Sequence, residues 1–380
     1  MNLARLRPTW AEIDLNAIQH NVAELRRCAP DAQFMAVVKA EGYGHGALQV
    51  ARAALDAGAT WLGVATLEEG VELRKAGLTA PVLIFGFIPP SQADMVVLYD
   101  LRPTLFHRDL AEALAQWGRV LMRRVPVHIK IDSGMGRIGV RPDEAVAFAQ
   151  IVAALPQLDI EGIFTHLATA DEPSSSQTSQ QLDRFAQTLA ALKGAGIEPR
   201  IRHTCNSAGI MLRPDGHYDL VRAGIALYGL APDPAVRWPA DLHPALTWKT
   251  RIGLVKTVEP GTPVSYGATY RAAATERIVT LPVGYADGYC RLLSNRGEVL
   301  VGGRRCPVVG RVCMDQTMVR VPDDLDVKVG DEVVLLGTQG DETVSAADIA
   351  AKVGTINYEV VCAISKRVPR LYKRDGEWLK

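Results

Sequence analysis

The 380-residue sequence has no excess of charge of either sign and no long apolar run. Its 42 basic and 42 acidic side chains balance to a formal net charge of zero, so no strong field favours nucleic acid or an anionic membrane surface. No stretch reaches the roughly 20 apolar residues of a membrane span, and residues 1–10 lack the apolar core of a signal peptide. These absences predict a cytoplasmic protein that binds neither nucleic acid nor membrane and that takes a small neutral or zwitterionic ligand.

Cysteine is also scarce, and what there is lies scattered. The six cysteines show no paired spacing of the kind that binds zinc. They are Cys28, Cys205, Cys290, Cys306, Cys313 and Cys362. In a reducing compartment such isolated cysteines are free thiols. The sequence therefore predicts no disulfide and no metal site.

A third absence bears on the fold. No glycine-rich dinucleotide fingerprint follows the first expected strand, which weakens the alternative of an open, doubly wound sheet. Between residues 34 and 230, short apolar runs alternate with alanine- and leucine-rich segments of helical spacing, such as Ala47 to Gly58. Gly77 and Gly196 stand where helices are expected to end. Eight apolar runs predict an α/β fold of the (β/α)8 TIM type. The runs are Phe34 to Ala40, Trp61 to Thr66, Pro81 to Gly86, Arg102 to Phe106, Pro126 to Asp132, Ile160 to His166, Ile201 to Asn206 and Leu220 to Tyr228.

The composition changes after the last of these runs. Residues 232–244 are rich in proline, and β-branched runs such as Arg277 to Pro282 and Glu332 to Leu336 then recur between glycine turns. We therefore expect a barrel over residues 1–240 and a mostly β C-terminal domain over residues 241–380. About the first 12 residues are expected to pack with the C-terminal domain.

Polar residues collect at the ends of the expected barrel strands, where barrel enzymes hold their reactive groups. Lys39 closes the first strand after three apolar residues, and burial of its amine would lower the amine's pKa and favour a Schiff base with a carbonyl compound. The glycine-rich run Glu41 to Gly46 allows close approach of a ligand to the backbone. Ser207 and the run Arg222 to Ile225 are suited to binding a phosphate. A strand-end lysine and a glycine-rich loop are equally compatible with a solvated barrel rim.

From Ala36 to Gly46 the sequence resembles the cofactor-lysine signature of alanine racemases, a family of pyridoxal-phosphate-dependent, barrel-type isomerases. The resemblance continues through further motifs over nearly the whole chain. They are Lys130 to Arg137, Thr165 to Asp171, Val264 to Gly267, Gly284 to Gly288, Cys313 to Gln316 and Ile356 to Glu359.

The resemblance implies a function and its catalytic residues. Lys39 would hold pyridoxal 5'-phosphate as an aldimine and serve as one base in the interconversion of L- and D-alanine. Tyr266 would be the second base and would come from the partner subunit, so a homodimer with shared sites is implied. Inverting a stereocentre requires a proton to leave one face and another to arrive at the opposite face, which calls for two such groups. The product would supply peptidoglycan synthesis, or the enzyme would serve alanine catabolism.

The same resemblance assigns roles to other residues. Arg222 would face the pyridine nitrogen and limit delocalisation of charge into the ring. Arg137 and Met314 would bind the substrate carboxylate. In many family members the lysine that matches Lys130 is carbamylated, a modification that would make it a negative partner for Arg137. The remaining cofactor-binding residues implied are Tyr43, His166, Asn206, Ser207, Gly224, Ile225 and Tyr358. Residues implied behind the site or along the corridor that admits substrate are Asp171, Tyr285, Arg291, Arg311, Asp315 and Ile356.

Two other functions share part of this pattern. A barrel-type amino-acid decarboxylase would share the half around Lys39, but it would have an acidic residue in place of Arg222. A non-catalytic pyridoxal-phosphate carrier would lack the β domain that holds Tyr266 and Met314. Both features of the sequence favour the racemase.

Overall fold

The computed structural model describes residues 7–379, and they form two compact units. The barrel unit comprises Ile18–Gly42 and Ala47–His243. The β-rich unit comprises residues 7–17, Tyr43–Gly46 and residues 244–379. Within residues 7–379, no helix is both long enough and apolar enough to cross a bilayer.

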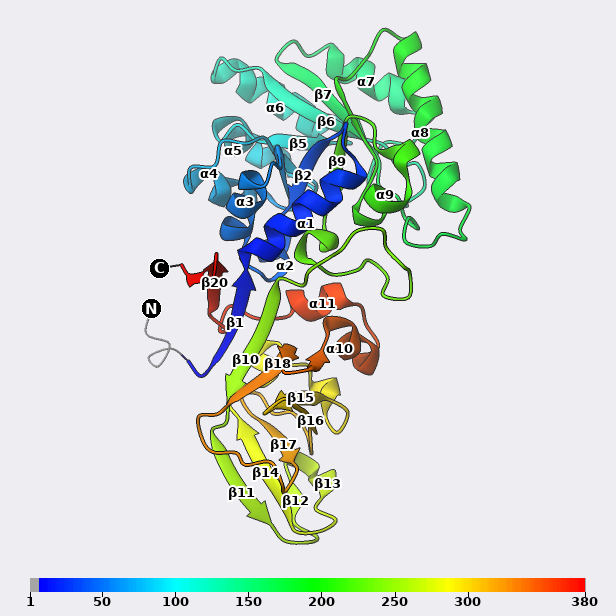
Figure 1. The fold of residues 1–380 in the computed structure, drawn as a ribbon. Helices are drawn as coiled ribbons and strands as arrows, with labels where there is room; N and C mark the ends of the chain where they lie inside the picture. The colour runs from blue at the N-terminus through cyan, green and yellow to red at the C-terminus, as the bar shows by residue number, and fades with distance from the viewer. Residues whose placement is uncertain (1–6, 380) are drawn as a thin grey trace. The chain divides into compact units, whose positions relative to one another are not determined.

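The barrel unit is built around eight parallel strands in the order β8-β7-β6-β5-β4-β3-β2-β9 (Figure 1). The two end strands approach each other and nearly close the barrel: the backbone N–H of Asp219 donates to the carbonyl of Arg202 at 3.0 Å, and that of Arg222 donates to Cys205 at 3.1 Å. The strands are β2 (Gln33–Val37), β3 (Trp61–Val64), β4 (Val82–Ile84), β5 (Arg102–Leu105), β6 (Val125–Lys130), β7 (Leu158–Phe164), β8 (Ile201–His203) and β9 (Leu220–Ala223). All eight predicted strands are present, and the predicted barrel fold is confirmed.

Helices cover the outside of this sheet (Figure 1). They are α1 (Leu15–Cys28), α3 (Ala47–Asp56), α4 (Leu67–Lys75), α5 (Ala93–Leu98), α6 (Arg108–Val120), α7 (Ala145–Ala153), α8 (Gln177–Gly194) and α9 (Ser207–Leu212). The helix ends follow local chemistry. Thr66 and Glu69 form a reciprocal capping box at the start of α4. Gly77 and Gly196, with φ of 83° and 76°, adopt the left-handed conformation just beyond α4 and α8, as predicted.

The core of the barrel unit is apolar at most positions, but several polar side chains are buried in it. Strand residues such as Met35, Leu62 and Leu83 are fully buried, and burial stabilises each by about 1.5–3 kcal/mol. His128 on β6 and His203 on β8, with β7 between these strands, are also fully buried. Because a buried polar group is destabilising unless it is hydrogen-bonded, these two histidines need partners inside the barrel.

The β-rich unit contains a large mixed sheet and two small ones. The large sheet has the order β16-β15-β18-β10-β1-β20-β21, with β19 paired to β18, and the small sheets are β11-β14-β17 and β12-β13. β1 (Thr9–Asp14) pairs antiparallel with β10 (Leu246–Arg251) and parallel with β20 (Arg370–Arg374). The other strands are β11 (Leu254–Val258), β12 (Pro263–Val264), β13 (Tyr270–Arg271), β14 (Glu276–Leu281), β15 (Glu298–Val301), β16 (Arg304–Pro307), β17 (Thr317–Val321), β18 (Glu332–Gln339), β19 (Glu342–Val344) and β21 (Glu377–Trp378).

Two helices in this unit, α10 (Ala346–Val353) and α11 (Asn357–Cys362), were not predicted from the sequence. α10 starts with a capping box between Ser345 and Asp348 and ends at Gly354 in the left-handed conformation. The prediction of a mostly β domain is still confirmed, since most elements of this unit are strands of its three sheets.

Candidate active site

Lys39 lies directly after β2, at the carboxyl end of the barrel strands, and a left-handed turn follows it. Ala40, Glu41 and Gly42 in the short segment α2 (Lys39–Tyr43) have φ of 52°, 55° and 58°. Residues with a Cβ are unfavourable by about 1–2 kcal/mol each in this conformation. The turn is held by the backbone N–H of Ala40, which donates to Glu69 Oε1 at 2.7 Å, and by that of Gly42, which donates to the Val38 carbonyl at 2.9 Å. Such strain is typical of functional segments, and here it fixes the backbone that carries the lysine.

Arg222 lies on β9 and is almost completely buried, with 3% of its surface exposed. Its Nη2 donates to the carbonyls of Thr165 and Thr204 at 2.9 and 2.8 Å, and to His166 Nδ1 at 3.4 Å. Burial lowers the pKa of the Arg222 guanidinium to about 10, so the group stays charged at neutral pH. The barrel therefore holds a permanent cation at the carboxyl ends of β7, β8 and β9.

A chain of buried hydrogen bonds runs away from Arg222. Its Nη1 lies 2.9 Å from His203 Nδ1, and His203 Nε2 lies 2.9 Å from His128 Nδ1. His128 Nε2 in turn lies 3.5 Å from Glu161 Oε2. Because a guanidinium can only donate, His203 Nδ1 must accept, so Nε2 carries the ring proton and donates to His128. His128 then carries its proton on Nε2, facing the carboxylate.

The charges around this chain keep its histidines neutral. Burial, followed by the charge of Arg222, lowers the pKa of His203 well below its ordinary value, and burial also lowers that of His128. Burial alone would raise the pKa of Glu161, but the hydrogen bond from His128 and the nearby Arg102 and Arg200 outweigh burial and hold that pKa below its usual range. The chain thus connects a cation at one end to a carboxylate at the other through two neutral imidazoles.

His166 and Lys130 lie near the same cation and respond to it. Burial, and then the charges of Arg222 and Lys130, lower the pKa of His166 well below its ordinary value. Lys130 is buried, and its amine lies 4.8 Å from the centre of the Phe164 ring. Burial and the charges of Arg222 and Arg137 lower the pKa of Lys130 to about 7. A large fraction of this amine is therefore neutral and nucleophilic at physiological pH.

Asn206 and Ser207 stand at the start of α9 and organise the backbone around them. The Asn206 side chain caps α9 by accepting from Gly209 N–H at 3.0 Å. The Ser207 hydroxyl accepts from the N–H groups of Gly224 and Ala226, at 2.9 and 3.2 Å, around Ile225. The predicted residues Ser207, Gly224 and Ile225 are therefore neighbours in space.

Arg137 lies in the loop after β6 and is exposed. One carboxylate oxygen of Asp132 accepts from the N–H groups of Gly134, Met135 and Gly136, at 2.8–3.1 Å, and so shapes this loop. Asp171 is partly buried in the segment after β7.

In the β-rich unit, Tyr266 begins the turn η5 (Tyr266–Ala268) and is 71% exposed. Its neighbours are strained: Ser265, Gly267 and Ala268 have φ of 66°, 71° and 48°. The Ser265 hydroxyl fixes the turn by donating to the carbonyl of Arg311 at 2.6 Å. The phenol is thus presented to solvent from a backbone that is itself firmly held.

Backbone hydrogen bonds bring Met314 and Tyr285 together. The N–H of Tyr285 donates to the Cys313 carbonyl and that of Ala286 to the Met314 carbonyl, both at 3.0 Å. Gly284 makes this approach possible, because a Cβ there would lie 2.2 Å from the Cys313 carbonyl oxygen. Met314 is 54% exposed and Tyr285 is 42% exposed.

The other predicted residues of this unit are also accounted for. Tyr43 is buried, its ring centre lies 6.3 Å from that of Tyr358 on α11, and burial raises the pKa of the Tyr43 phenol. Asp315 accepts from Arg367 at 2.7 Å. Arg291 and Ile356 are exposed, and Arg311 is partly buried.

Sequence analysis missed the interior members of the barrel network, which are His128, His203, Glu161 and Thr165. Within each strand they look like isolated polar residues, and His128 and His203 are 75 positions apart. A polar residue inside an otherwise apolar strand was the one available signal, since a buried polar group requires a partner.

Comparisons with known proteins agree with this geometry. Residues 13–232 match the model of the alanine racemase N-terminal domain, and residues 245–372 match that of the C-terminal domain. The chain is 57% identical to the alanine racemase of Symbiobacterium thermophilum over 372 residues, which cover 98% of this chain and 99% of that protein. The structure of alanine racemase from Clostridium difficile 630 superposes with a TM-score of 0.95 at 41% identity, covering 99% of this chain and 98% of that one. A histidine racemase from Leuconostoc mesenteroides superposes with a TM-score of 0.90 at 29% identity, covering 97% and 99%.

These matches extend over both units of the chain at identities far above those that indicate the fold alone. The chain belongs to the alanine racemase family of enzymes.

Proposed function

We propose that this enzyme interconverts L- and D-alanine with pyridoxal 5'-phosphate, using Lys39 and Tyr266 as two bases in sites shared by two copies of the chain. The observation that carries the proposal is the buried Arg222 cation, held by two carbonyls and by His203 at the carboxyl end of the barrel. A decarboxylase needs an acidic partner for the pyridine nitrogen, whereas the residue held in this network is the cation Arg222.

The residues present fit that cofactor. A phosphate requires N–H and hydroxyl donors, which Ser207 and the backbone around Ile225 supply close together. A pyridine ring requires a flat neighbour and a donor for its nitrogen, which the neutral His166 and the charged Arg222 offer. An aldehyde requires an amine at the strand end, which is Lys39. Tyr43 and Tyr358, which we assign to the phosphate as well, belong to the β-rich unit.

Pyridoxal phosphate, when bound, supplies an aldehyde for the amine of Lys39 or of the substrate and an electron-withdrawing ring that acidifies the proton on the alanine α-carbon. The Lys39 amine would remove or return that proton on one face. The strained turn after Lys39 holds this amine in place during the transfer. Arg222, as a permanent cation, would disfavour protonation of the ring nitrogen and so limit delocalisation of charge into the ring, which would suppress side reactions.

Tyr266 serves the opposite face of the α-carbon and comes from a second copy of the chain. Its phenol is 71% exposed, as a group that completes a neighbour's site must be before assembly. The exposed side chains of Met314, Tyr285 and Ile356 lie on the same unit and are proposed to be covered in the dimer. Each dimer would then contain two complete sites, which is the arrangement expected from an isologous interface.

Arg137 and the backbone N–H of Met314 are proposed to bind the substrate carboxylate. Tyr266, Met314 and Tyr358 would leave space for a side chain no larger than methyl, which favours alanine over the larger side chain of the histidine that the Leuconostoc neighbour is named for. We assign Asp171, Arg291, Arg311 and Asp315 to the corridor and to the support of these groups. D-Alanine made this way would supply peptidoglycan synthesis, or the enzyme would work in alanine catabolism.

Lys130 is proposed to carry a carbamate. Attack of its neutral amine on carbon dioxide forms one N–C bond and releases one proton, and the product is an anion beside Arg137 and Arg222. The pKa of about 7 supplies the neutral amine, and the two nearby cations stabilise the carbamate.

Hybrid dimers test the shared site directly. Lys39→Ala and Tyr266→Phe chains carrying different tags are co-expressed, and the mixed dimer is purified on both tags. Each variant homodimer should lose about 10²–10⁴-fold in racemisation, whereas the hybrid, with one intact site, should recover about half of the wild-type rate.

An inactive hybrid would show that both residues act within one chain or that Tyr266 is not a base. Release of carbon dioxide with ethylamine as the product, and no formation of D-alanine, would instead identify a decarboxylase. Cofactor absorbance without either reaction would identify a carrier.

A further inference from the structure

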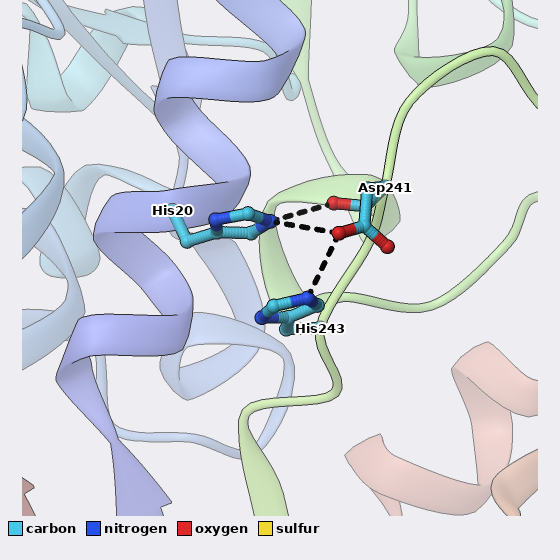
Figure 2. A group of neighbouring side chains, drawn as sticks. All are labelled: His20, Asp241 and His243. Atoms are coloured by element: carbon cyan, nitrogen blue, oxygen red, sulfur yellow. Dashed lines mark hydrogen bonds and ion pairs between the residues drawn. The ribbon is translucent and has the colours of Figure 1, made fainter.

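His20, Asp241 and His243 form a cluster in the barrel unit, apart from the residues described above (Figure 2). His20 Nε2 lies 3.7 Å from Asp241 Oδ2, and His243 Nε2 lies 3.1 Å from the same oxygen. The imidazole rings stack with centres 3.8 Å apart and planes 11° from parallel. Both rings therefore present Nε2 to one carboxylate.

The backbone that carries Asp241 and His243 is fixed by the helix that carries His20. Asn21, which is fully buried on α1, accepts from His243 N–H at 2.8 Å and donates to the His243 carbonyl at 2.9 Å. Glu24, one turn further along α1, accepts from Asp241 N–H at 3.1 Å. The side chains are exposed, but their attachment points are ordered in advance, which reduces the conformational entropy lost when a ligand is bound.

The local charge favours a cation. Glu24 accepts from Arg27 at 2.8 Å and from the backbone N–H of Asp241 at 3.1 Å. Together with Asp241 it gives two negative charges, against the single positive charge of Arg27, which is 2.8 Å from Glu24. An excess of one negative charge therefore remains beside the two imidazoles.

We propose that His20, Asp241 and His243 bind a divalent transition-metal ion of the zinc, cobalt or nickel type. Two imidazoles and one carboxylate are a donor set suited to these ions rather than to magnesium or calcium, which prefer oxygen. All three donor atoms lie within 4.8 Å of one another. In a tetrahedral zinc site with bonds near 2.0–2.1 Å, donor atoms lie about 3.3 Å apart, and the two distances to the Asp241 oxygen bracket that value.

Binding requires two local adjustments. His20 Nε2 lies 2.9 Å from the carbonyl of Asp241, so its proton must move to Nδ1 before Nε2 can coordinate an ion. The stacked rings must also tilt so that their lone pairs converge. His243, half of whose side chain is exposed, has the space to do so. Because the cluster is open to solvent, water completes the coordination shell.

The bound ion would fasten the end of the barrel unit to α1. Asp241 and His243 are among the last residues of that unit, and His20 is among its first. An ion that binds only the folded state stabilises it in proportion to the logarithm of its concentration over Kd, so this site would raise the resistance of these two segments to opening.

Calorimetric titration of the tag-free holoenzyme with Zn²⁺ tests the proposal. We expect one site in the wild type, lost in His20→Asn and in His243→Asn. Glu24→Gln, which removes a negative charge beside Asp241 but no proposed donor atom, should weaken the site roughly 10–100-fold. Asp143→Asn is the matched control, since Asp143 is an exposed carboxylate of the same unit that contacts Arg141, and its curve should equal that of the wild type. Zinc bound to cysteine thiols persists in every variant and cancels in the comparison.

Anomalous scattering at the zinc edge in soaked crystals should place the ion between His20, Asp241 and His243. Wild-type protein that takes up no zinc at this cluster, or that gives the same titration curve as both histidine variants, would overturn the proposal.

Discussion

The two units contribute opposite kinds of side chain to the proposed site. In the barrel unit Arg222, Lys130 and the histidines behind them are buried and hydrogen-bonded or packed on the core. In the β-rich unit Tyr266 and Met314 project into solvent. A buried polar group must be compensated by its own chain, whereas an exposed one is available to another chain. We therefore propose that folding completes the barrel half of the site and that association with a second copy completes the β-rich half.

The two halves nevertheless share a backbone feature. Lys39 is followed by the left-handed Ala40 and Glu41, and Tyr266 is flanked by the left-handed Ser265 and Ala268. These non-glycine residues are unfavourable in such a conformation, so both turns exist because surrounding hydrogen bonds impose them. Lys39 and Tyr266, which we assign to proton transfer, therefore both lie next to strained turns.

The largest expected effect separates the two proposed bases. Tyr266→Phe should lower the rate of racemisation by about 10²–10⁴-fold. The variant should still exchange the α-proton of one enantiomer with solvent, because Lys39 still serves one face. Lys39→Ala should lose exchange for both enantiomers. Proton NMR of L- and D-alanine in D2O measures this exchange. Tyr270→Phe, in the same unit but bonded to Glu276, is the control and should behave as the wild type. Equal loss of exchange for both enantiomers in Tyr266→Phe would contradict the two-base assignment.

The second effect concerns stability and follows directly from burial. Arg222→Leu leaves the carbonyls of Thr165 and Thr204 and the ring of His203 without their donor, so we expect a loss of about 3–5 kcal/mol in the free energy of unfolding. Tyr266→Phe removes an exposed hydroxyl and should change it by less than about 0.5 kcal/mol. Urea denaturation of both variants at fixed protein concentration gives the comparison. Similar values for the two would remove the distinction between the halves.

The sequence predicted the barrel well because each strand has a local signal. Apolar runs bounded by turns identify parallel strands, and all eight runs correspond to strands. The predicted ends were less accurate: the run to Ala40 ends as a strand at Val37, and the run to Tyr228 ends at Ala223. The second run stays apolar beyond the last residue of its strand, and periodicity cannot show where pairing stops. α10 and α11 were missed for a related reason, since they are short and lie among β-branched runs.

The candidate site was predicted as far as its residues lie in motifs. Lys39, Arg222 and Tyr266 belong to such runs, whereas His128, His203 and Glu161 are linked only through space. The cluster of His20, Asp241 and His243 could not be predicted from the sequence for the same reason. Cysteine spacing reveals only metal ligands that are close in the chain, whereas His20 and Asp241 are separated by 221 positions. Pairings across such distances in the chain are decided by the fold.

A third effect is the pH dependence caused by Lys130. Its folded-state pKa of about 7 lies below the ordinary value of 10.5, so between these values the unfolded chain binds more protons than the folded one. The folded state is destabilised by the burial of the protonated Lys130 amine, fully so below pH 7 and less as pH rises. The free energy of unfolding should therefore increase on the order of 3–5 kcal/mol between pH 7 and 10.5. Lys130→Met should lack this increase when denaturation is followed from pH 7 to 9 in buffer free of carbon dioxide. Added bicarbonate should flatten the wild-type curve if the amine becomes a carbamate. An identical slope in wild type and variant would exclude Lys130 as its source.

The smallest effect tests the far end of the buried chain. Glu161→Gln keeps an oxygen near His128 Nε2 but removes the charge, and a hydrogen bond to a charged group contributes about 1.5–3 kcal/mol. Because the pKa of Glu161 is lowered in the folded state, its contribution is present above the ordinary pKa and is lost as pH falls through the folded value. The variant should therefore be less stable than the wild type at pH 7, and the gap should close in acid. Glu198→Gln, which removes an exposed partner of Lys193, should change stability by less than about 1 kcal/mol. If the Glu161 gap stays constant down to acid pH, the carboxylate acts by shape rather than by charge, and the chain from Arg222 ends at His128.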